Sequence, residues 1–312
     1  MTTEKGQVLA SERRSKYKRN PRPVSFHLTD RDVDILHALN RYRYLRTGQV
    51  HELLFSDNAT IQSARRRLRN LYHHGLIARA QPYVQVGKPA PEITYYLDRK
   101  GRNILREQGV EEVHLWRKGG EVKYHFLEHA IALSQFRIHL EKAVAAMDDV
   151  ELELFIPEFQ MRRAAEDYAG RKRYLLFREA FHPVHQKNFV VHPDALIVLS
   201  RRVQGTKRHL MLCLEIDRGT EGMEKIRDKL TGYQLAKEQK LFRPIADIPS
   251  FFVLFQAPNE RRASSIFHAL VDHVGADITR VGSAQEVTAE SILSASIWRD
   301  AEGKRKAILR GS

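Results

Sequence analysis

Apolar residues recur at spacings of three and four in three stretches between residues 27 and 74, which predicts three helices. Their apolar positions are Val33, Leu36 and Leu39, then Val50, Leu53 and Leu54, then Ile61, Ala64, Leu68 and Leu71. Thr29 and Thr47 stand at expected helix caps, and Gly75 follows the third helix as a C-cap glycine. Strand-like segments 76–79 and 93–97 flank the turn-rich segment 87–91, and Asp98 caps a closing helix. This order predicts a winged helix-turn-helix over residues 27–110.

From residue 123 onward, strand-like and helical stretches alternate, and we expect an α/β domain with a mixed central sheet over residues 123–310. Helices are predicted over 124–147, 220–239 and 260–274, and strands over 151–156, 173–178, 192–199, 210–217 and 251–255. The polar stretch 201–208 predicts a hairpin turn, and 182–192 reads as irregular. A last strand with Trp298 is expected in 291–309, and 111–122 reads as a linker. The predicted fold class is therefore α+β or α/β.

Positive charge is concentrated at the N-terminal end of the chain. The net charge is +14, of which residues 1–25 carry +5 (seven Lys and Arg, two acids) and residues 26–110 carry +6 (fourteen and eight). Residues 1–26 predict a disordered basic arm, which either follows DNA or serves as a solubilising tail. This distribution predicts double-stranded DNA as a partner. The single cysteine, Cys213, excludes a disulfide framework, and with no long apolar run or secretory signal we expect no membrane contact and a cytoplasmic location.

The third predicted helix carries the residues best suited to reading DNA. Leu68 and Leu71 anchor one side, which leaves Gln62, Arg66 and Arg69 on the opposite face. An exposed arginine stripe on the second helix of a helix-turn-helix suits phosphate and guanine contacts in the major groove. Further predicted DNA contacts are Arg65 on the same helix, Arg43 and Arg46 in the preceding turn, and Lys88 in the wing.

Acidic residues cluster at the ends of two predicted strands. Pro193 and Asp194 precede the run 195–199, and Glu215 and Asp217 end the run 210–217. Because strand side chains alternate, Glu215 and Asp217 share a face, and a hairpin between the two runs brings Asp194 close to Glu215. Three carboxylates in one place favour a divalent cation such as Mg²⁺. The alternative is that Asp217 pairs with Arg218, Lys225 or Lys229 in a structural ion network without metal.

These motifs carry a resemblance to known families. Pro193-Asp194 followed by Glu215 resembles the PD-(D/E)xK nuclease superfamily, and the run 215–221 with an N-terminal winged helix resembles the replication-relaxation family. The resemblance implies a restriction-endonuclease-like domain, a metal held by Asp194, Glu215 and a first-helix glutamate (Glu128 here), and a role in plasmid or mobile-element replication, relaxation or mobilisation. The superfamily lysine two positions after the glutamate is absent, because Asp217 stands there. Lys225 and Lys229, one turn apart on the next helix, are expected to replace it, so the predicted catalytic set is Asp194, Glu215, Asp217, Lys225 and Lys229.

Three functions fit this sequence. The first is a DNA-binding accessory factor of a mobile element whose nuclease-like domain is catalytically silent. The second is an active Mg²⁺-dependent endonuclease or nickase, and the third is a winged-helix transcription regulator whose C-terminal domain dimerises. A homodimer and contacts with relaxase or replication proteins are further expectations. His125 and His129, one turn apart on the predicted helix 124–147, are expected to have a structural role because no third ligand has matching spacing.

Overall fold

The computed structural model describes residues 17–55, 58–80, 92–113, 124–162 and 170–309, which form two compact units. The units comprise residues 1–134 and 135–312, and the boundary falls within helix α5 (Tyr124–Ala145). The fold is mixed α+β, as predicted. Most of the predicted linker, residues 114–122, and most of the predicted arm, residues 1–16, lie outside the described residues. Within those residues, the structure contains no helix with the length and hydrophobicity that crossing a membrane requires.

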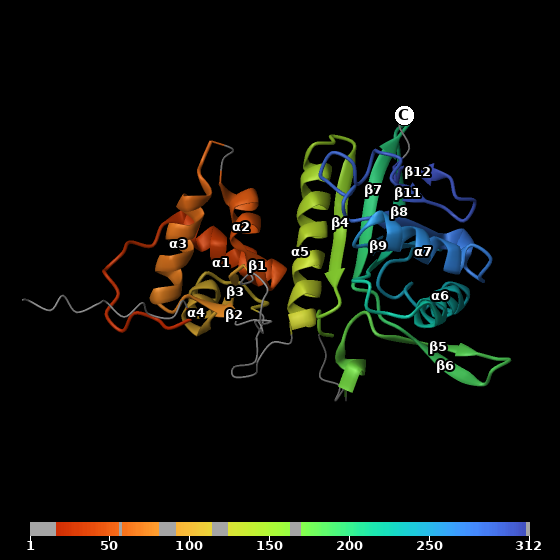
Figure 1. Ribbon diagram of the computed structural model, residues 1–312, viewed down its shortest axis with the longest axis horizontal. Helices are drawn as coiled ribbons and strands as arrows, with labels where there is room; N and C mark the ends of the chain where they lie inside the picture. Colours follow the sequence, from red (N-terminus) through yellow and green to blue (C-terminus); the bar gives the residue numbers. More distant parts are fainter. Residues whose placement is uncertain (1–16, 56–57, 81–91, 114–123, 163–169, 310–312) are drawn as a thin grey trace, which may run out of the picture. The chain divides into compact units, whose positions relative to one another are not determined.

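The N-terminal unit contains a cluster of helices and a small antiparallel sheet (Figure 1). Its sheet has the strand order β1-β3-β2. Along the chain its elements are α1 (Asp30–Tyr42), β1 (Leu45–Arg46), α2 (Thr47–Leu54), α3 (Ile61–His73), β2 (Ile77–Ala80), β3 (Thr94–Leu97) and α4 (Arg99–Glu107), followed by the first part of α5. This order is the one predicted for residues 27–110, with an additional short strand, β1.

Local sequence signals account for where these helices begin and end. Thr29 is the N-cap of α1, and its backbone N–H donates to the Asp32 carboxylate at 2.9 Å. Asp98 caps α4 by accepting from the backbone N–H of Arg99 at 2.7 Å, as predicted. Gly75 ends α3 with a φ of 78°, a backbone conformation that favours glycine. The second helix begins at Thr47, so that its cap is the preceding arginine rather than the predicted threonine.

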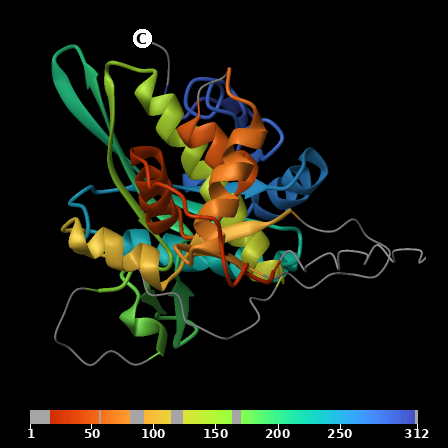
Figure 2. The ribbon, with the colours of Figure 1, turned by 90° about the vertical axis from the view of Figure 1, so that its left-hand side faces the viewer.

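The C-terminal unit is built on a seven-stranded mixed sheet with the order β12-β11-β10-β9-β8-β7-β4. Strands β8, β9 and β10 run parallel to one another, and the other neighbouring pairs are antiparallel. The strands are β4 (Val150–Pro157), β7 (Ala195–Val203), β8 (Thr206–Ile216), β9 (Phe251–Ala257), β10 (Thr279–Ser283), β11 (Trp298–Arg299) and β12 (Arg305–Lys306). The predicted hairpin at 201–208 is confirmed, and Figure 2 shows it extending as a two-stranded ribbon.

Helices α6 (Met223–Glu238) and α7 (Glu260–Leu270) connect the parallel strands and lie on one side of the sheet, whereas the part of α5 after residue 134 lies on the other (Figure 1). Leu196, Cys213 and Val253 face α6 and α7 within the main hydrophobic core. Burial of these apolar surfaces supplies the main driving force for folding.

A second, two-stranded sheet packs against α6. It consists of β5 (Arg178–His182) and β6 (Lys187–Val191). The predicted strand at 173–178 is wrong, because a short 3-10 helix (η1, Gly170–Arg173) ends there and a turn follows before β5 begins at Arg178. A second 3-10 helix, η2 (Ala276–Ile278), precedes β10. The segment 182–192, expected to be irregular, instead contains β6 and the turn that joins it to β5. Gly232 of α6 allows the approach, since a Cβ there would lie 3.0 Å from Val191 and 3.3 Å from Phe189.

Candidate functional site

The β7–β8 hairpin places Asp194 opposite Glu215. Ala195 pairs with Leu214 in the antiparallel register, so Asp194, one residue earlier in the chain, lies opposite Glu215, one residue later. The Asp194 backbone N–H donates to the Leu214 carbonyl at 2.9 Å. Its carboxylate accepts from the backbone N–H of Ile216 at 2.6 Å. The predicted approach of these two acidic residues is therefore confirmed, and the hairpin register is its cause.

Glu215 is a buried carboxylate with a partner on each oxygen. Its side chain is 4% exposed. The Tyr233 hydroxyl donates to Glu215 Oε1 at 2.5 Å, and the Lys229 ammonium donates to Oε2 at 2.8 Å. Lys229 and Tyr233 are one turn apart on α6, which begins shortly after β8 ends, so one helix face supplies both donors. A buried carboxylate requires such partners, because leaving it unpaired costs several kcal/mol.

Glu221 extends this arrangement toward the surface. Its carboxylate lies 2.8 Å from the Lys229 ammonium and 2.5 Å from the Lys225 ammonium. Lys225 is 66% exposed and Lys229 is 30% exposed. Of the two predicted lysines, the structure therefore brings Lys229 to Glu215, whereas Lys225 pairs with Glu221. No pattern in the sequence singled out Glu221 as a site residue.

Asp217 has a different partner from the other two acids. Arg262, in the first turn of α7, binds its carboxylate with two hydrogen bonds of 2.7 and 3.0 Å. The backbone N–H of Gly219 adds a third at 3.0 Å. Arg262 also donates to the Glu221 carbonyl at 2.6 Å, which ties the loop after β8 to α7. Asp217 is thus part of a structural ion pair, and its partner is none of the three basic residues considered from the sequence.

The charges in this cluster alter the protonation equilibria of its members. Burial would lower the pKa of the Lys229 ammonium, but the carboxylates of Glu215 and Asp194 reverse that effect and raise its pKa above the ordinary value. Burial together with the neighbouring Glu215 charge raises the pKa of the Tyr233 hydroxyl. Lys229 is therefore charged and Tyr233 is a neutral donor at physiological pH. Burial, aided by the Asp194 charge, raises the pKa of the Glu215 carboxyl, and the Lys229 ammonium and the Tyr233 hydroxyl oppose that shift.

The residues present do not fit the magnesium that the nuclease resemblance implies. Mg²⁺ binds carboxylate oxygens directly, so a cation already paired with a carboxylate competes with it for the oxygens. Here both oxygens of Glu215 already accept hydrogen bonds, and both oxygens of Asp217 are bound by Arg262. Glu128, the third predicted ligand, belongs to the N-terminal unit and forms an ion pair with Arg46 there. A metal ion would have to displace Lys229 to reach Glu215.

His192 lies beside this cluster, two residues before Asp194. Its ring stacks on Tyr174 with centroids 5.6 Å apart, and its Nε2 atom is 3.1 Å from the Glu158 carbonyl. Burial lowers the pKa of its imidazole below the ordinary value, although Glu158 and Asp194 oppose the shift. The neutral His192 ring therefore fixes the chain just before Asp194 through its contacts with Glu158 and Tyr174.

In the N-terminal unit, α3 presents a cationic face to solvent. Gln62, Arg65, Arg66 and Arg69 are exposed, whereas Leu68 on the other side is fully buried. The side chains of the three arginines have no ion pair or hydrogen bond among the described residues. The helix thus has the orientation predicted from its apolar spacing, except that Ile61, predicted to face inward, is exposed at the first position of the helix.

Other arginines of this unit are held by neighbouring groups. Arg67 of α3 binds the fully buried carboxylate of Asp32, with Nε at 2.8 Å from Oδ1, so it belongs to the core. Arg46 pairs with Glu128, and the Arg43 guanidinium lies 4.8 Å from the centroid of the Phe126 ring. Arg43 and Arg46, which were predicted to contact DNA, therefore have partners within the unit. Lys88 lies outside the described residues.

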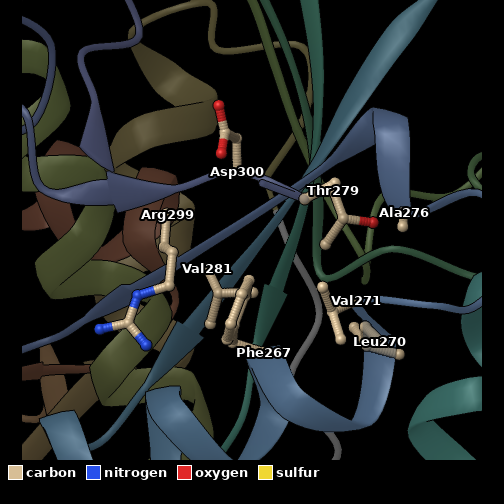
Figure 3. Close-up of a pocket in the computed structure, with 9 residues that line it drawn as sticks. Phe267, Leu270, Val271, Ala276, Thr279, Val281, Arg299 and Asp300 are labelled. Atoms are coloured by element: carbon tan, nitrogen blue, oxygen red, sulfur yellow. The ribbon is translucent and has the colours of Figure 1, made fainter. Parts of the chain in front are cut away.

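A small pocket lies elsewhere in the C-terminal unit, between α7, β10 and β11 (Figure 3). Its lining is mainly apolar and includes Phe267, Leu270 and Val281, with Arg299 and Asp300 at one side. Arg299 is engaged by Glu260 at 2.7 Å. None of the acidic residues singled out in the sequence lines this pocket.

These features define a mixed α+β protein with a cationic helix in one unit and a buried acid–lysine cluster in the other. The chain belongs to the replication-relaxation family, whose model matches residues 36–247, more than half of its length. The description of the family suggests a role in the replication or relaxation of plasmids or other mobile elements. No curated protein and no solved structure gives a significant match.

Proposed function

We propose that this protein binds double-stranded DNA during the replication or relaxation of a mobile element, and that its nuclease-like C-terminal domain does not cut DNA. The observation that carries the proposal is the face of α3, where Arg65, Arg66 and Arg69 are exposed without a partner among the described residues. Three unpaired guanidinium groups on one helix repel one another, and phosphate groups would neutralise them.

The arrangement of the N-terminal unit supports a winged helix. A helix, a short strand, two further helices and an antiparallel hairpin follow one another, and β1 joins the hairpin as a third strand. In this fold the helix before the hairpin enters the major groove. That helix is α3, so Gln62 near its N-terminal end would face base edges, while Arg65, Arg66 and Arg69 would contact phosphates or guanine.

The C-terminal unit supports a PD-(D/E)xK-like domain that lacks catalysis. The β-hairpin with Asp194 and Glu215 and the lysine on the following helix correspond to the predicted nuclease pattern, including the relocated lysine. Lys229 and Tyr233 take up the oxygens that a catalytic metal would need. We therefore favour a role for this domain in positioning or association over one in hydrolysis.

DNA binding is tested with the full-length chain and a labelled duplex at 0.1 M salt. A variant with Arg65, Arg66 and Arg69 all changed to Ala removes three contacts, each worth about tenfold at this salt concentration, and we expect a loss of affinity on the order of 1,000-fold. The matched control changes Arg99, Lys100 and Arg106, which are exposed on α4, to Ala and removes the same charge. An equal loss in both variants would contradict recognition through α3.

Absence of catalysis is tested by plasmid nicking with Mg²⁺ and with Mn²⁺. We expect no metal-dependent cleavage by the wild-type protein above the level of an Asp194→Ala, Glu215→Ala double variant. Cleavage by the wild type that the double variant lacks would establish an active nuclease, and it would leave the proposed DNA binding by α3 intact.

A further inference from the structure

We infer that the hairpin β5–β6, together with the basic helix η1 beside it, forms a binding surface for single-stranded DNA. The inference goes beyond the proposed function, because it assigns a second nucleic-acid site to the C-terminal unit and a different form of DNA as its ligand. It needs neither α3 nor a double helix, so its failure would leave duplex binding by α3 standing.

Positive charge in the C-terminal part of the chain is concentrated in residues 170–192. This stretch contains five Lys and Arg and one acidic residue, which gives a net charge of +4. Residues 111–312 together carry only +3, because residues 1–110 hold +11 of the chain's +14. Outside the stretch this part of the chain is therefore slightly acidic, at −1. A local excess of positive charge attracts phosphate groups.

Two exposed cations of this stretch have no acidic partner. Arg171 and Lys187 form no ion pair within the part of the chain that the structure describes. The Lys187 ammonium lies 4.4 Å from the centroid of the Phe189 ring, which keeps it close to the hairpin. The single acid of the stretch, Glu179, lies 3.7 Å from the Lys172 ammonium, and this contact brings η1 next to β5. Both of its side chains are exposed, so the pair is weak.

The two faces of the hairpin differ in what covers them. Ala180, Phe189 and Val191 are buried and belong to the main hydrophobic core, which includes residues of α6. Because side chains alternate along a strand, Phe181 and Val190 point the other way, and they are 45% and 47% exposed. Figure 1 shows the hairpin projecting beside α6. An aromatic ring is thus presented to solvent next to the cations of η1.

The backbone at Phe181 is held in a fixed position although its ring is exposed. The side-chain amide of Gln239, at the end of α6, accepts from the Phe181 backbone N–H at 3.3 Å and donates to its carbonyl at 2.7 Å. These two hydrogen bonds occupy the groups through which β5 would pair with an added strand at this residue. The ring remains available, which favours a ligand that stacks on it over a peptide that extends the sheet.

A single strand of DNA offers both groups that this surface can bind. Proteins that bind single strands combine cations that follow the phosphates with aromatic rings on which bases stack. In a duplex each base is enclosed between its neighbours, so its face is not accessible to a ring. We therefore assign the stacking of a base to Phe181 and phosphate contacts to Arg171 and Lys187.

The experiment follows the fluorescence anisotropy of a labelled oligothymidylate of about 12 nucleotides, a usual length for such sites. The full-length chain carries Ala in place of Arg65, Arg66 and Arg69 throughout, so that these side chains of α3 do not contribute. In this background Phe181→Ala removes the ring, Phe181→Leu replaces it with an apolar group and Phe181→Tyr keeps a ring. Val274→Ala is the matched control, because Val274 is an apolar residue of the same unit that is 54% exposed.

We expect Phe181→Ala and Phe181→Leu to weaken binding of the oligothymidylate about tenfold, because one stacked base is lost. Phe181→Tyr and Val274→Ala should leave the affinity unchanged. None of these variants should change the affinity for a duplex of equal length. If Phe181→Ala lowers the Tm, Phe181→Leu, which retains the apolar bulk, carries the test.

The cations are tested by the salt dependence of binding to the same oligothymidylate. Arg171→Ala combined with Lys187→Ala should reduce the magnitude of the slope by about 1.4, since each contact with a single strand contributes about 0.7. Arg202→Ala combined with Arg208→Ala removes the same charge from exposed positions of the β7–β8 hairpin and should leave the slope unchanged.

Five results would overturn the inference. They are no binding of the oligothymidylate, full affinity in Phe181→Leu, an equal loss of duplex binding in Phe181→Ala, equal salt slopes in the two double variants, and binding of an oligouridylate of the same length in place of the oligothymidylate. Full affinity in Phe181→Leu would indicate an apolar contact of the kind that a protein partner makes.

Discussion

Removing the Lys229 ammonium should destabilise the C-terminal unit far more than removing its neighbour on α6. In Lys229→Met the buried Glu215 carboxylate keeps only its Tyr233 partner while Asp194 still repels it. Breaking a buried ion pair from one side costs about 3–5 kcal/mol, and since Lys229 is 30% exposed we expect about 3 kcal/mol. For a unit of this size that corresponds to a fall in Tm of roughly 6–12 °C.

A double-mutant cycle separates this ion pair from simple loss of packing. Glu215→Gln alone leaves Lys229 with Glu221, and we expect it to cost about 2 kcal/mol. The combination with Lys229→Met contains no buried charge at either position, so its cost should be smaller than the sum of the single costs by about 2 kcal/mol. Lys225→Met should cost less than about 1 kcal/mol, because the Lys225 side chain that pairs with Glu221 is mostly exposed to solvent.

The assay is urea denaturation of the wild type and the four variants at pH 7, followed by far-ultraviolet circular dichroism. Equal slopes of the unfolding free energy against urea would show that the variants unfold from comparable native states. Additivity of the two single substitutions within about 0.5 kcal/mol would refute the reasoning, because independent sites behave in that way. A cost for Lys225→Met equal to that for Lys229→Met would refute it as well.

Three further predictions address other parts of the structure. Arg67→Ala should cost about 3 kcal/mol in urea denaturation, since it leaves the buried Asp32 carboxylate without its guanidinium, and an effect below about 1 kcal/mol would contradict this. Burial lowers the pKa of His192 in the folded state, so as the pH falls the unfolded chain binds a proton at this residue first, and stability is lost below about pH 6.5. In His192→Gln the fall in unfolding free energy between pH 7.5 and 5.5 should therefore be smaller than in the wild type, and an equal fall would count against this prediction. Gly282→Ala should lower the unfolding free energy by about 1–3 kcal/mol, because its Cβ would lie 2.8 Å from the Trp298 ring, and an unchanged urea midpoint would refute that steric account.

Local patterns in the sequence were sufficient for several parts of the fold. The apolar spacing in α3 predicted which of its residues face solvent, and the structure agrees for Gln62, Arg66 and Arg69. The turn between β7 and β8 fixed the hairpin register and therefore the approach of Asp194 to Glu215. Both features depend on residues that are near one another in the chain, where period and turn position decide the outcome.

Features that depend on distant segments were not predictable in this way. Arg262 reaches Asp217 because β9 lies beside β8 in parallel, which places the start of α7 at the end of β8. Alternation along the strand predicted that Asp217 would share a site with Glu215, but it gives no information about a partner 45 positions later in the chain. Likewise, Arg67 is similar to its neighbours in the sequence, and only the tertiary fold of the unit gives it Asp32 of α1 as a partner.

The central claim, that α3 neutralises DNA phosphates, is tested most directly by the salt dependence of binding. The logarithm of the binding constant should fall linearly with the logarithm of salt concentration, and each phosphate contact contributes about 0.9 to the slope. We predict that changing Arg66 and Arg69 to Ala reduces the magnitude of the slope by about 1.8, whereas changing Arg99 and Arg106 of α4 leaves it unchanged. A slope that is the same in the wild type and in the Arg66, Arg69 variant would contradict the account.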